Sequence, residues 1–113
     1  MMLDILRSAH DTLQDELAQE KASALGRLGR RLEGALAALA ACPHSADVDR
    51  DLRDHLVAQA GYALWLFVVQ REACGLNDSV QIMRRYGVPN EVRYRMGPLP
   101  KRFRDTESAS QNS

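Results

Sequence analysis

The sequence predicts an all-α fold of two long antiparallel helices followed by a short C-terminal helical hairpin. Leucine and alanine, both strong helix formers, are the commonest residues, whereas aromatic residues make up only 5% of the chain. Apolar residues also recur at intervals of three and four, the period of an amphipathic helix. A chain of 113 residues has room for one core. We therefore expect one helical domain over residues 1–102 and a disordered polar tail over residues 103–113.

The first long helix is predicted from about Leu3 to Ala41. Pro43 ends it, because proline fixes its own φ and disfavours helical geometry at the residue before it. Gly26 and Gly29 leave open whether the helix is straight or bent. An apolar stripe begins the helix, slips in phase and resumes near Leu25; its first part consists of Leu3, Leu6, His10, Leu13 and Leu17.

The second long helix is predicted to begin at a cap formed by Ser45 or Asp47 and to run to about Cys74, where Gly75 stops it. Its C-terminal half, residues 62–69, is apolar on every side. A helix of that kind must be covered on more than one side. We expect that a single neighbouring helix does not suffice.

Two short helices complete the predicted fold. Asn77 or Asp78 caps the first, and Gln81, three residues after Asp78, suggests a capping box. This helix ends at Gly87, which we expect in the left-handed conformation that reverses the chain. The last helix is predicted to begin with Pro89 and to run over residues 90–96.

The predicted lengths favour a homo-oligomer, most simply a dimer. A helix of about 38 residues is roughly 57 Å long, whereas a compact chain of this size has a radius of gyration of about 13 Å. Either the first helix bends at the glycines, or it extends beyond its own domain and buries its stripe on another copy or on a protein partner. The candidate interface residues are Leu6, Leu13, Leu17, Tyr62, Trp65, Leu66 and Phe67.

Charge is unevenly distributed, although the chain is neutral overall. Residues 71–104 contain eight basic and three acidic residues, and within them residues 78–96 resemble the helix-turn-helix of transposase and resolvase DNA-binding domains. This resemblance implies a small DNA-binding regulator as the alternative function. The would-be reading helix is short, however, and Gly97-Pro98 interrupts it, so a hairpin that caps the bundle is the simpler interpretation. The residues that would contact nucleic acid are Arg84, Arg85, Arg93 and Arg95.

No motif in the chain indicates catalysis or a cofactor. Cys42-Pro43-His44 lacks the paired ligands of a zinc site, and His55, near Asp51 and Asp54, lies on a strongly acidic helix start. We expect no enzymatic activity, no metal and no cofactor. The densest apolar run, residues 61–69, is too short to cross a bilayer, and the two cysteines suit a reducing compartment. These features predict a cytoplasmic protein that has no membrane segment.

The whole chain resembles a small bacterial family of helical proteins that is classified as a domain of unknown function. The resemblance rests on the leucine-rich first helix, on Ala63-Leu64-Trp65, and on the turn of residues 86–92 ahead of Arg95-Met96-Gly97. It implies a helical fold but no activity and no catalytic or binding residues. The sequence therefore predicts a non-enzymatic module that oligomerises or binds a partner.

Overall fold

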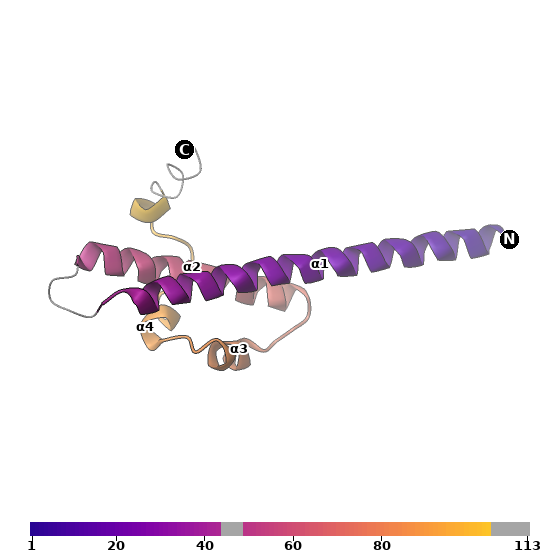
Figure 1. The fold of residues 1–113 in the computed structure, drawn as a ribbon. Helices are drawn as coiled ribbons and strands as arrows, with labels where there is room; N and C mark the ends of the chain where they lie inside the picture. The colour runs from indigo at the N-terminus through magenta and orange to yellow at the C-terminus, as the bar shows by residue number, and fades with distance from the viewer. Residues whose placement is uncertain (44–48, 105–113) are drawn as a thin grey trace.

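The structure, a computed structural model, describes residues 1–43 and 49–104. Two long helices, α1 (Met2–Ala41) and α2 (Arg50–Ala73), pack side by side and run antiparallel. Two short helices, α3 (Ser79–Arg85) and α4 (Asn90–Arg93), follow below them in Figure 1. Within the described ranges the chain forms no strand. The predicted all-α class and the order of the elements are confirmed.

The first helix is continuous through the two glycines at which the sequence allowed a bend. Gly26 and Gly29 lie within α1, which forms one rod in Figure 1. The helix ends at Ala41, and Cys42 takes an extended conformation with φ −77° and ψ 118°. This is the geometry that Pro43 favours at the residue before it, so the predicted end of the helix is confirmed.

The second helix begins later than predicted. Asp49 is its N-cap, because the Oδ1 atom of Asp49 accepts a hydrogen bond of 2.9 Å from the backbone N–H of Asp51. Ser45 and Asp47, the expected caps, lie outside the described residues. The carboxylate at position 49 therefore caps the helix.

The core lies between the two long helices and is closed by the short ones. Leu32 and Leu39 of α1 belong to one buried cluster with the inner face of α2 and with residues that follow it. The other members are Val57, Ala60, Ala63, Leu64, Phe67, Val68, Ile82, Val88 and Val92. The inner face of the apolar half of α2 is therefore covered on more than one side by its own chain, whereas Val69 remains exposed.

A smaller cluster joins the C-terminal segment to α2. Phe103 is buried with Ala58 and Leu99, and Tyr62 packs against them. The ring of His55 meets the Phe103 ring edge to face at 5.2 Å between centroids. The predicted domain boundary at residue 102 is therefore too early, because an aromatic side chain beyond it completes this cluster. The rest of the predicted tail, residues 105–113, lies outside the described residues.

The turn between the short helices has the predicted backbone geometry, whereas the helices themselves differ from the prediction. Gly87 has a φ of +61°, in the left-handed region. The capping box is wrong, because Asp78 makes no cap hydrogen bond and pairs instead with Arg71. The last helix ends at Arg93, three residues early, and Pro89 is its N-cap instead of its first residue.

The ion pair between Arg71 and Asp78 joins α2 to the start of α3. Arg71 donates from Nε to Oδ1 at 2.9 Å and from Nη2 to Oδ2 at 2.5 Å, which is bidentate geometry. This hydrogen-bonded guanidinium lowers the pKa of the Asp78 carboxyl below its ordinary value. The folded state therefore favours the ionised carboxylate more strongly than the unfolded state does.

Replacement of Asp78 by asparagine tests this pair. Because the folded-state pKa is lowered, the stabilisation is fully present above the unfolded pKa and is lost as the pH falls through the folded value. We expect Asp78→Asn to melt at a lower temperature than the wild type at pH 7, and the difference to shrink below about pH 4. Thermal unfolding of both proteins between pH 7 and pH 2 measures this. A difference that stays constant over the whole range would contradict it.

Gly61 allows α2 to approach the segment after α4. A Cβ at this position would lie 2.7 Å from the carbonyl carbon of Arg95, a distance that real Cβ contacts do not show. Arg95 is also tied to α2 because its Nη1 donates to Asp54 Oδ1 at 2.6 Å. Glycine at position 61 is therefore required by close backbone packing.

Two matched glycine substitutions separate this packing effect from helix propensity. We expect Gly61→Ala to lower the free energy of unfolding by about 1–3 kcal/mol, since the added methyl displaces the backbone at Arg95. The control is Gly34→Ala in α1, where a Cβ meets nothing within 4 Å. This change should raise the free energy of unfolding by up to about 1 kcal/mol, because alanine favours the helix more than glycine does. Denaturant unfolding measures both, and an equal effect of the two changes would contradict the packing account.

Candidate functional site

The two long helices differ greatly in length, so α2 leaves part of α1 uncovered. The 40 residues of α1 span about 60 Å, and the 24 residues of α2 span about 36 Å. The molecule measures 73 × 35 × 21 Å, and α1 projects from one end of it (Figure 1). Every residue from Met1 to Ser23 is exposed, and we refer to residues 1–23 as the N-terminal arm.

The N-terminal arm carries the predicted apolar stripe on its surface. The side chains of Leu6, Leu13 and Leu17 are 60%, 52% and 47% exposed, and Leu3 and Ile5 are more exposed still. The spacing of three and four residues between stripe positions places them along one side of the helix. Three of the seven predicted interface residues therefore lie on an open helical face.

The same row of leucines continues into the core. Leu6, Leu17, Leu28 and Leu39 are spaced by eleven residues, which is close to three helical turns and keeps them in line. Leu39 is buried and Leu28 packs against the core, whereas Leu17 and Leu6 are exposed. The face that α2 covers in the body of the molecule therefore continues, uncovered, along the arm. The eleven-residue spacing is visible in the sequence and could have revealed this continuity.

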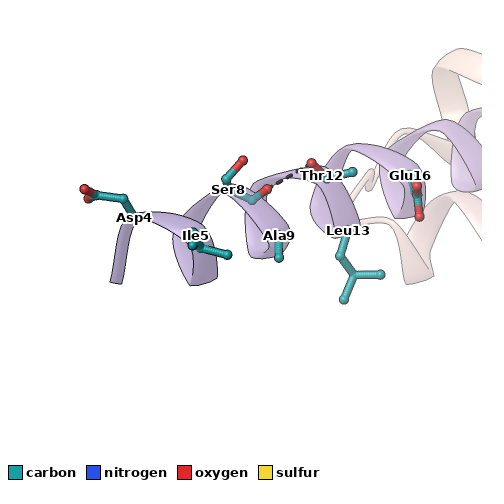
Figure 2. A pocket seen from close by; sticks show the side chains of 7 residues that line it. All are labelled: Asp4, Ile5, Ser8, Ala9, Thr12, Leu13 and Glu16. Atoms are coloured by element: carbon teal, nitrogen blue, oxygen red, sulfur yellow. Dashed lines mark hydrogen bonds between the residues drawn. The ribbon is translucent and has the colours of Figure 1, made fainter. Parts of the chain in front are cut away.

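Figure 2 shows the arm from close by, with the side chains that line a shallow depression on it. Ile5, Ala9 and Leu13 project to the same side, whereas Ser8 and Thr12 lie away from them. The hydroxyl of Thr12 donates to the carbonyl oxygen of Ser8 at 2.9 Å, within the same helix. All seven lining residues come from α1, so the depression is a helix face and not a cleft between elements.

The predicted interface residues on α2 are less available. Phe67 is 3% exposed and meets Tyr86 edge to face at 5.6 Å, so it belongs to the core of its own chain and the prediction for it is wrong. Tyr62, Trp65 and Leu66 are half-buried. The Tyr62 ring packs against Trp65 at 6.2 Å and lies 5.0 Å from the Arg31 guanidinium. The short helices and α1 supply the cover that the sequence assigned to another copy.

The arginines proposed for nucleic-acid contact do not form one surface of a reading helix. Arg84 and Arg85 are exposed on α3, and Arg93 is exposed and donates to the Val88 carbonyl oxygen at 3.3 Å. Arg95 instead pairs with Asp54. The second helix of the motif has four residues, about one turn. A helix that reads the major groove needs several residues along its length to face the bases, and α4 is too short to supply them.

The remaining candidates for chemistry do not gather into a site. Among residues 1–43 and 49–104, no three histidine, cysteine or carboxylate side chains are placed to hold a metal ion. His10 is exposed on the arm and His55 packs against Phe103, while His44 lies outside the described residues. Nor does any helix of the described chain have the length and hydropathy to cross a membrane.

Comparison with known proteins assigns the chain to a family but not to an activity. No curated protein and no solved structure matches it. One family model, described as a family of unknown function, DUF6665, matches residues 3–104. This range includes both long helices, both short helices and nearly all of the N-terminal arm. The chain therefore belongs to the DUF6665 family of unknown function.

Proposed function

We propose that the protein is a homo-oligomerising helical module and that its N-terminal arm is the surface through which copies associate. The observation that carries the proposal is the exposed stripe of Leu6, Leu13 and Leu17 on a helix that continues beyond the body. Soluble monomers rarely expose a continuous apolar face of this kind. In this proposal the module acts through contact and not through catalysis.

Helix energetics support the same function. A helical segment of about 20 residues that packs on nothing is marginally stable in water, because most helix stability in proteins comes from the packing of an apolar face. Full burial of one leucine side chain contributes roughly 1.5–3 kcal/mol. The stripe supplies several leucine side chains, and about half of the surface of each is still exposed in the single chain. Pairing with a second copy therefore stabilises the arm and covers its apolar side chains together.

A charge placed in the stripe tests the proposal. We expect the wild type at micromolar concentration to have a mass of at least twice 12.6 kDa, because the stripe is buried between copies. Leu6→Glu should return the mass to about that of one chain, since a carboxylate buried among the stripe leucines is strongly unfavourable. Light scattering gives both masses.

The matched control adds the same charge on the other side of the arm. Ser8 lies away from Leu13 in Figure 2 and is exposed, so Ser8→Glu should retain the mass of the wild type. Circular dichroism during heating should show a cooperative unfolding transition of the core in both variants, because every residue of the arm is exposed. A wild-type protein that is monomeric at micromolar concentration would overturn the proposal.

A further inference from the structure

We propose that two N-terminal arms pair antiparallel, with the two-fold axis between His10 and Leu13. The partner's arm then packs on the same face of α1 that α2 covers in the body, and it begins where α2 ends. This inference rests on the proposed function and specifies the orientation of the same surface. In this register Leu6 faces the partner's Leu17, and His10 faces the partner's Leu13. Each stripe leucine in the middle of the arm then meets an apolar or imidazole side chain.

The end of α2 fits this register. A Cβ on Gly29 would lie 3.5 Å from the Phe67 ring, so these two positions face each other across α1 and α2. Six residues further along α2 is its last residue, Ala73, which in an antiparallel pair comes opposite residue 23 of α1. With Leu6 opposite the partner's Leu17, the partner's Met2 comes opposite Lys21. The partner's arm therefore begins next to the place where α2 ends, without overlap.

Parallel pairing conflicts with the body of the molecule. The leucine row that is exposed at Leu6 and Leu17 is occupied by α2 from Leu28 onward. Two parallel arms in register would bring the partner's α1 toward that occupied face after residue 23. The antiparallel pair avoids this collision, because each body lies beyond the N-terminal end of the other arm. It also places the positive N-terminal end of one helix dipole near the negative C-terminal end of α2.

The charge pattern of the arm favours the same orientation. Residues 11–20 contain four acidic and no basic side chains, Asp11, Asp15, Glu16 and Glu20, whereas residues 1–10 contain one acidic and one basic residue, Asp4 and Arg7. Parallel pairing places the two acidic halves side by side and puts Glu20 against its copy in the seam. Antiparallel pairing sets each acidic half against a neutral half. Like charges at such close range destabilise a helix pair.

Cysteine cross-linking tests the orientation. In a Cys42→Ala, Cys74→Ala background, Leu6→Cys and Leu17→Cys are prepared separately and mixed under mild oxidation. We expect a disulfide-linked dimer only in the mixture, because the two positions face each other and a disulfide needs Cα atoms within about 7 Å. Ser8→Cys, away from the stripe, is the control and should form none. Cross-linking of either variant with itself would overturn the antiparallel arrangement.

Spin labels that leave the leucines intact give an independent answer. For labels on Thr12→Cys the antiparallel pair predicts almost no separation along the arm axis, and for labels on Gln19→Cys about 22 Å. Parallel pairing predicts equal distances at both positions, which would overturn the inference. Light scattering on the same samples separates the two proposals. A dimer with the wrong distances contradicts the orientation alone, whereas a monomer contradicts the proposed function as well.

Discussion

The packing of α2 along α1 is the contact on which the other parts of the fold depend. Leu32 and Leu39 are buried because α2 lies against them. The helix pair also creates the surface on which α3, α4 and the segment around Phe103 pack. The length of α2 also sets a limit, since its 24 residues leave the start of a 40-residue helix without cover. One helix pair therefore determines both the core and the exposed N-terminal arm.

Much of this architecture could be predicted from the sequence because local signals dominate in long helices. The three-and-four spacing of leucines and the effect of Pro43 located α1, and Gly87 located the reversal between the short helices. The stripe at Leu6, Leu13 and Leu17 was also predictable from its three-and-four spacing, and its overhang follows from the length of a straight helix. These features do not require knowledge of which segments meet in the folded chain.

The predictions that failed depend on contacts between distant segments. Asp78 has the sequence of a capping residue, but Arg71 lies within reach and offers two hydrogen bonds to its carboxylate. Phe67 was assigned to an interface, but Tyr86, which follows α3, meets its ring edge to face and places it in the core of its own chain. Phe103 follows a proline-rich stretch, and its place against Ala58 arises only once α2 is in position. In each case a tertiary contact overrode a local pattern.

The division into a body with its own core and an exposed arm is the basis of the proposed function. The body buries a core of its own. Its ion pairs, such as Arg53 with Glu91 at 2.5 Å and Arg95 with Asp54 at 2.6 Å, hold the short segments to α2. The arm, in contrast, leaves its leucine side chains exposed. An exposed leucine row in line with a buried one has the chemistry of an unfinished helix pair, which in the proposed assembly a second copy of the chain completes.

Hydrogen exchange of the arm is the most direct test of the claim that pairing completes α1. In an assembled protein the backbone amides of residues 5–20 should be protected at high micromolar concentration, and dilution should reduce that protection while the amides of α2 stay protected. Mass spectrometry of peptides from both segments over a dilution series measures this. Arm amides that exchange at unprotected rates at every concentration, beside a protected α2, would contradict the account.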